Sequence, residues 1–166
     1  MSDRPEIKHT ALFEMDGLMR EKLAEGGRVT FSPKGVSMRP MLNPRGDSVT
    51  LELPAERLRP GAVALFVSGD SDGGQKYILH RLVKRRKAGL VFMGDSRREA
   101  DPPVREEDVI GVVTGFVHNG KSYTGREPGM RLYARWMVLT RNLRGPALWA
   151  QGAVLRIRRR LNKRGG

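Results

Sequence analysis

The stretch from residue 29 to residue 124 alternates short apolar runs with breaks that contain Pro, Gly and Asp. Runs this short, bounded by turn-forming residues, are typical of β-strands in a sheet with many turns. We predict strands at residues 29–31, 48–53, 62–67, 77–83, 90–93 and 109–117, with Asn119-Gly120 turning the last of these into a partner strand at 121–124. The predicted fold class is therefore mainly β.

Apolar residues recur at helical spacing on both sides of this β-rich stretch. Residues 6–25 predict an amphipathic N-terminal helix that ends at Gly26-Gly27. After Met130 the helical spacing returns, with Trp and Leu among Arg residues, and predicts basic amphipathic helices at the C-terminal end. We therefore expect three parts, with a boundary at the Pro and Gly that follow Glu127: an N-terminal helix in 1–28, a β domain in 29–127 and a basic helical tail in 128–166.

The positive charge of the chain is concentrated in the tail. The 166 residues hold 31 Lys and Arg against 18 Asp and Glu, a net charge of +13. Residues 131–166 contain ten of the basic residues and none of the acidic ones, which leaves 21 basic and 18 acidic residues for 1–130. We expect such a tail either to contact an anionic membrane surface or to pack on the β domain with its basic face in solvent. Nucleic acid is not an expected partner, because no base-reading module is recognisable.

The sequence predicts neither an export signal nor a membrane-spanning segment. The most apolar long window, residues 132–155, contains three Arg residues, and the first 27 residues contain six carboxylates and no apolar core. We expect a cytoplasmic protein, with peripheral membrane contact as the alternative. The chain has no Cys and only three His, far apart in the sequence, so we expect no disulfide, no metal and no cofactor.

Residues 115–122 match the spacing of a phosphate-binding loop, G-x-x-x-x-G-K-[ST]. That loop works by opening a helix whose N-terminus holds the phosphates. The residues that directly follow, 123–129, include two Gly and a Pro and do not predict a helix of useful length. Because Asn119-Gly120 predicts a hairpin turn instead, we do not expect nucleotide binding here.

Three separate segments carry the side chains of a candidate acyl-transfer site. Ser37 lies two residues after Gly35, on a bend that would expose its hydroxyl and let its own N–H serve as an oxyanion donor. His80 lies on a predicted strand, and Asp95 and Asp101 lie in the loop after the next one. Taken singly, these residues are more often a loop serine, a half-buried histidine and solvated carboxylates, so their combination is what matters.

Together the segments resemble the ordered sequence boxes of the type I signal peptidases. Gly-x-Ser-Met-x-Pro at 35–40 is followed by His-Arg-Leu-Val at 80–83, by Gly-Asp at 94–95 with a further Asp at 101, and by Asp-Val-Ile-Gly at 108–111. The match is closest to the Ser/His branch, because His80 stands where the other branch and the LexA-like repressors carry Lys. The resemblance covers about residues 29–117 and implies a signal-peptidase/LexA-like β fold.

The resemblance also implies a role for each matching residue. Ser37 would be the nucleophile, His80 the general base and Asp101 the group that orients the imidazole. Histidine suits this task because its pKa, ordinarily about 6.5, lets it accept a proton at neutral pH. Supporting roles are implied for Asp95, Gly35, Met38 and Pro40.

The expected function is that of a serine endopeptidase of the signal-peptidase type, which cleaves a protein or leader peptide after small residues. The resemblance implies that the substrate binds extended, as an added strand. The alternative is a catalytically inactive, peptidase-like module that binds peptides and is tethered to a membrane surface. A LexA-like repressor is not expected, because only about 28 residues precede the first box, too few for a three-helix DNA-binding module.

Overall fold

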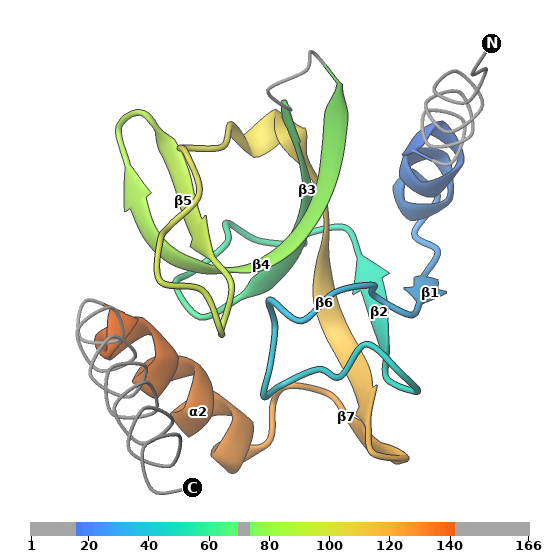
Figure 1. The fold of residues 1–166 in the computed structure, drawn as a ribbon. Helices are drawn as coiled ribbons and strands as arrows, with labels where there is room; N and C mark the ends of the chain where they lie inside the picture. Colours follow the sequence, from blue (N-terminus) through green and yellow to red (C-terminus); the bar gives the residue numbers. More distant parts are fainter. Residues whose placement is uncertain (1–15, 70–73, 142–166) are drawn as a thin grey trace, which may run out of the picture.

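The structure is a computed structural model that describes residues 16–69 and 74–141 of the chain. A helix occupies residues 16–24, and the remaining elements follow in chain order: β1 (Val29–Phe31), β2 (Ser48–Glu52), β3 (Val63–Gly69), β4 (Gln75–Arg86), β5 (Gly89–Met93), η1 (Glu106–Asp108), β6 (Val109–His118), β7 (Lys121–Tyr123) and α2 (Pro128–Leu139). The helix at 16–24 and α2 lie far apart, on either side of the sheet (Figure 1).

The seven strands form one antiparallel sheet in the order β1-β2-β6-β3-β4-β5, and β7 pairs with β6 (Figure 1). The prediction of a mainly β protein is therefore confirmed. Strand β4 is longer than the predicted strand at 77–83, because it continues into the charged residues Lys84–Arg86, which pair with β5. The division into parts at 1–28, 29–127 and 128–166 stays a prediction.

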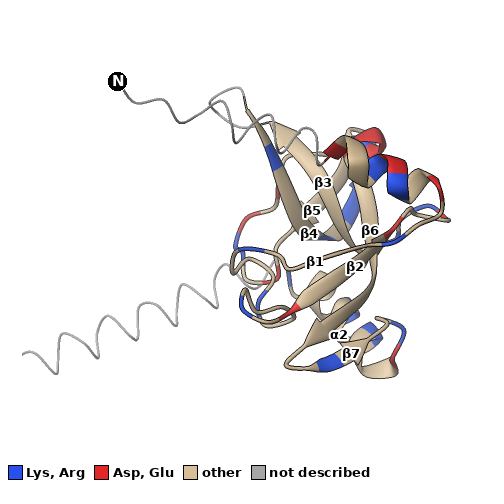
Figure 2. Ribbon diagram, turned by 90° about the vertical axis from the view of Figure 1, so that its right-hand side faces the viewer, with Lys and Arg blue, Asp and Glu red and all other residues tan. Residues whose placement is uncertain are grey.

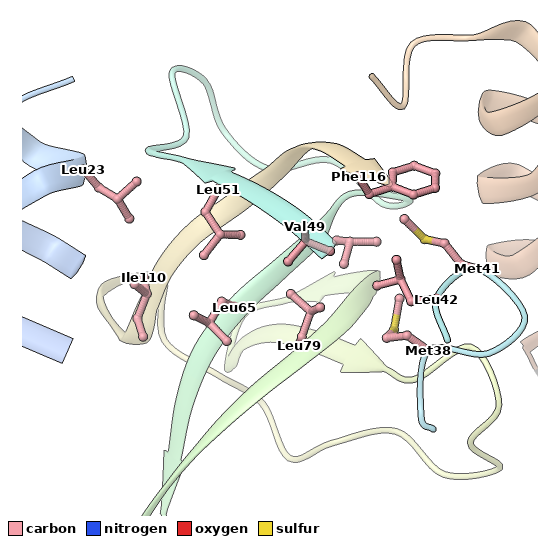
Figure 3. Close-up of a cluster of buried hydrophobic side chains, with 11 residues drawn as sticks. Leu23, Met38, Met41, Leu42, Val49, Leu51, Leu65, Leu79, Ile110 and Phe116 are labelled. Atoms are coloured by element: carbon pink, nitrogen blue, oxygen red, sulfur yellow. The ribbon is translucent and has the colours of Figure 1, made fainter. Parts of the chain in front are cut away.

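Both faces of strand β3 are buried, and the sheet encloses two apolar clusters. Val63 and Leu65 belong to the larger cluster, whose side chains come from the helix at 16–24, the segment after Ser37 and strands β2, β3, β4 and β6 (Figure 3). Ala64 and Phe66, which point the other way, join the smaller cluster with residues of β4 and β5. Strand β4 also contributes side chains to both clusters from its two faces. Its pairing with β5 shifts register between Leu82 and Lys84.

Helix α2 begins at Pro128. Proline is favoured in the first turn of a helix because the backbone N–H that it lacks would have no partner within the helix there. The predicted boundary at this Pro and Gly is thus the first turn of α2. Met137 is buried, and Met130 and Tyr133 pack against the larger apolar cluster. No helix in the described ranges is long and apolar enough to cross a membrane; residues 1–15 and 142–166, which hold the rest of the two predicted helical ends, lie outside them.

The phosphate-loop pattern at 115–122 is the hairpin between β6 and β7. Asn119 and Gly120 both have positive φ angles, 49° and 76°, as a two-residue hairpin turn requires. The hairpin is fastened to the turn that precedes β2 by the buried Asp47 carboxylate. That carboxylate accepts hydrogen bonds from the Asn43 N–H (2.6 Å), from His118 Nδ1 (2.7 Å) and from the Asn119 N–H (3.0 Å).

These hydrogen bonds make the fold sensitive to acid. Burial raises the pKa of Asp47, but hydrogen bonds from Asn43, His118 and Asn119 outweigh burial and hold the pKa below its usual 3.8. The ionised carboxylate therefore stabilises the fold above about pH 4, and this contribution is lost as the pH falls through the lowered pKa.

We expect Asp47→Asn to be less stable than the wild type at pH 6 and to lose less further stability on acidification to about pH 2. Urea unfolding at several pH values measures both effects. The matched control is Glu56→Gln, which removes a carboxylate on a side chain that is 82% exposed. An equal acid-induced loss of stability in wild type and Asp47→Asn would contradict the assignment.

Candidate active site

Ser37 opens a turn whose following residues are held in the core. The chain reaches it through Gly35, whose φ of 114° disfavours any residue with a side chain. The Leu42 N–H donates to the Met38 carbonyl at 3.0 Å, and both side chains are buried. Among the described residues the Ser37 N–H has no acceptor, so it can donate to an oxygen that develops negative charge beside it. The sequence thus provides a rigid turn with a free donor at its start.

His80 lies near the middle of strand β4 and is only 3% exposed. Its Nδ1 lies 2.6 Å from Asp101 Oδ2. An ionised carboxylate only accepts hydrogen bonds, so the ring proton of a neutral His80 lies on Nδ1 and the lone pair lies on Nε2. Asp101 is itself placed by its N–H, which donates to the Phe92 carbonyl at 2.8 Å. The pair is therefore oriented with Nε2 as the proton acceptor.

Gly94 allows the Ser37 turn and His80 to lie close together. A Cβ at this position would lie 2.7 Å from the Ser37 carbonyl oxygen and 2.9 Å from His80 Nε2. Both atoms therefore approach the same side of Gly94, and they could not do so if it carried a side chain. The basic atom of His80 thus faces the segment that carries Ser37.

Ser96, two residues after Gly94 in the same loop, fixes this arrangement. The Ser96 N–H donates to the Ser37 carbonyl at 2.9 Å, and Ser96 Oγ donates to the Val36 carbonyl at 2.8 Å. Two consecutive carbonyls at the Ser37 turn are therefore bonded to the loop that follows β5. Sequence reasoning missed Ser96, because neither bond is visible until the two segments are folded together.

Ser37 and His80 line one cleft of about 700 Å³. One wall is the segment from Phe31 to Met38, and the other is β4 from Lys76 to His80. The floor is apolar, with Leu42 and Leu65 among its side chains. Residues 78–80 of β4 pair with β3 on one side, and their other edge pairs with no strand in the described part of the chain. An extended peptide laid along this edge would pass Ser37 and His80.

Asp95 does not face His80 but supports the loop from behind. Its carboxylate accepts from Arg81 Nε at 2.8 Å, from Arg81 NH2 at 2.7 Å and from the Tyr133 hydroxyl at 2.8 Å. Arg81 and Asp95 are both buried. Arg81 also donates to the Gly61 carbonyl, and its guanidinium lies 5.2 Å from the centre of the Tyr133 ring. Asp95 is therefore a structural anchor next to Gly94.

The structure brings together most of the residues that the sequence singled out. Ser37, His80, Gly35 and Met38 all line the cleft, and Asp101 is bonded to His80. Pro40 is exposed, follows a cis peptide bond and does not line the cleft. Within the described ranges no cluster of His, Cys, Asp and Glu could hold a metal ion.

Comparison of the sequence with protein-family models and with curated proteins gives no match.

The orientation of His80 can be measured directly. When the His80 imidazole is neutral, we expect ¹⁵N NMR to show its ring proton on Nδ1, because Asp101 accepts a hydrogen bond from that N–H. In Asp101→Asn that preference should weaken, and signal should move toward the Nε2–H form. Asp108→Asn, which removes a carboxylate bonded to Arg105 instead, should leave the His80 signals unchanged. A wild-type spectrum dominated by Nε2–H would contradict the geometry.

Proposed function

We propose that the protein is a serine endopeptidase that uses Ser37 as nucleophile, His80 as general base and Asp101 as the residue that orients the imidazole. The observation that carries the proposal is the single cleft in which Nδ1 of His80 is held by Asp101 while Nε2 faces the Ser37 turn. Along the chain the proposed nucleophile comes first, the general base second and the orienting carboxylate third. This is the order that the resemblance to the Ser/His signal peptidases implies.

The proposed reaction is acyl transfer. Ser37 Oγ attacks the carbonyl carbon of the scissile peptide while its proton passes to His80 Nε2. The Ser37 N–H stabilises the oxyanion that forms, and Asp101 stabilises the imidazolium. His80 then gives the proton to the leaving amine, which releases the C-terminal product and leaves an ester on Ser37. Water, deprotonated by His80, hydrolyses this ester and restores the free serine.

The cleft also suggests how a substrate binds. An extended peptide would add to the unpaired edge of β4 at residues 78–80, with its other side toward the segment that precedes Ser37. Gly35 and the buried Met38 line the cleft beside the nucleophile, and small residues before the cut are what the resemblance to the signal peptidases implies. We propose on this basis a signal-peptidase/LexA-like fold for the β domain, and a protein or leader peptide as substrate.

The decisive test is cleavage of a peptide library by matched variants. We expect Ser37→Ala to abolish cleavage and Asp101→Asn to lower kcat by about 10³- to 10⁴-fold, because the imidazole is no longer held in the required tautomer. Ser122→Ala, in the exposed strand β7, should cleave like the wild type. Mass spectrometry of the products gives the site of the cut, and a phosphonate probe should label Ser37 only.

The alternative, an inactive module that binds peptides, predicts another set of results. Wild type and Ser37→Ala would then bind library peptides equally, and neither would cleave them or react with the probe. Equal cleavage by wild type and Ser37→Ala would refute the serine mechanism altogether.

We further propose that α2 contacts an anionic membrane surface. Leu132, Trp136 and Leu139 are 70%, 56% and 76% exposed, and their spacing places them on one face of the helix. Arg131 and Arg135 are exposed beside them, α2 contains no acidic residue, and Figure 2 shows basic residues along it. An aromatic and aliphatic face flanked by Arg suits the headgroup region of an anionic bilayer.

Vesicle flotation of the full chain tests this proposal. We expect binding to vesicles of phosphatidylcholine with about 30% phosphatidylserine, weaker binding in high salt and a several-fold loss in Leu132→Ser/Trp136→Ser. Leu18→Ser removes a side chain that is 65% exposed elsewhere and should bind normally. Binding unaffected by the double substitution, or equal on uncharged vesicles, would contradict the proposal. The proposal would also be contradicted if the protein is monomeric and residues 142–166 shield Leu132 and Trp136 from solvent.

A further inference from the structure

The cleft that holds Ser37 and His80 has a cationic rim. Lys34, Lys76 and Arg97 line it together with one carboxylate, Asp16. Asp16 is already paired, since Arg20 Nε lies 2.9 Å from its Oδ1. The charge presented along the cleft is therefore positive, although residues 1–130 as a whole are nearly balanced.

Two of the cations that line the cleft, Lys34 and Arg97, differ in their pairing from the arginines of strand β4. Arg81 and Arg85 each bond to a carboxylate and to a backbone carbonyl. Lys34 and Arg97 are exposed and form no ion pair within the described part of the chain. No carboxylate in the described part of the chain neutralises these two charges, so both can interact with a ligand in the cleft.

Arg97 lies close to the reacting atoms. The Cβ position of Gly94 that lies 2.9 Å from His80 Nε2 also lies 2.7 Å from Arg97 Cγ. The Arg97 N–H donates to the Gly94 carbonyl at 3.0 Å, which fixes the start of the side chain. The Arg97 side chain thus starts beside the catalytic pair and lines the cleft, whereas Lys34 lies three residues before Ser37 on the wall of the cleft.

We infer that the cleft selects peptides that carry acidic side chains near the site of cleavage, with Arg97 recognising a carboxylate next to the cut and Lys34 one farther along. This rests on the proposed function, because it takes the cleft as the peptide site. An arginine fork suits a carboxylate in two-point contact, and a lysine offers a mobile point charge. An apolar floor between them accommodates small or apolar residues at the remaining positions.

The inference is tested with two sets of peptides built on a sequence that the enzyme cleaves, or, failing cleavage, on one that Ser37→Ala binds. In the near set, Glu, Gln or Lys stands beside the cut or at the centre of the bound peptide. In the distant set, the same residues stand three to four positions before it. The readouts are kcat/KM for the wild type and fluorescence anisotropy for binding to Ser37→Ala.

We expect both readouts to rank Glu above Gln above Lys, by about 3- to 10-fold per charge at low salt, with the ranking much reduced in 0.5 M NaCl as charges are screened. Arg97→Gln should remove the preference in the near set alone, and Lys34→Gln in the distant set alone. Arg57→Gln changes an exposed arginine outside the cleft and should preserve both preferences.

The outcomes separate this inference from the proposed function. Cleavage that is abolished by Ser37→Ala but does not depend on peptide charge would overturn the inference and leave the peptidase proposal standing. Charge-ranked binding without any cleavage would support the inference and count against the peptidase. A preference that survives both Arg97→Gln and Lys34→Gln would overturn the assignment to these two residues.

Discussion

The buried ion pair between Arg81 and Asp95 is the interaction on which the rest of the site depends. Two side chains of opposite charge lie in the interior, and the guanidinium is satisfied by both carboxylate oxygens, the Gly61 carbonyl and Met41 Sδ. Removing one partner of such a pair typically costs about 3–5 kcal/mol, because the other charge is left buried without compensation. Any placement that separates the two segments at this point would therefore be strongly disfavoured.

Each partner of the pair is directly preceded in the chain by a residue of the candidate site. Arg81 follows His80 on β4, and Asp95 follows Gly94 in the loop that meets the Ser37 turn. Tyr133, whose hydroxyl donates to Asp95, brings α2 into the same network. The pleat of β4 sends the Arg81 side chain to the opposite face from that of His80. One strand thus presents a structural anchor on one face and the candidate general base on the other.

The mainly β fold class could be predicted from the sequence, and the sequence also indicates the candidate site residues, but it does not predict the supporting contacts. Strands were recognisable because each is an apolar run bounded by turn residues, and the Asn119-Gly120 hairpin has a specific turn chemistry. The order of the sequence boxes indicates Ser37, His80 and Asp101 as candidates. The bonds of Ser96 depend on how the loop after β5 packs against a segment about sixty residues earlier in the chain. The ion pair of Arg81 depends on the register between β4 and β5, and no local pattern encodes either arrangement.

For the charge of the molecule, too, the sequence predicts the overall excess, but only the structure shows which charged side chains are paired. Composition predicts an attraction to anionic partners, but it assigns that attraction to the tail, where the basic residues outnumber the acidic ones. In the nearly balanced remainder, the effective charge depends on which cations already have a carboxylate. Arg20, Arg28 and Arg105 are paired, whereas Lys34 and Arg97 are not. Since a Coulombic attraction across a few ångströms of a partly enclosed cleft exceeds the same attraction across bulk water, two unpaired cations there influence a bound peptide more than many at a distance.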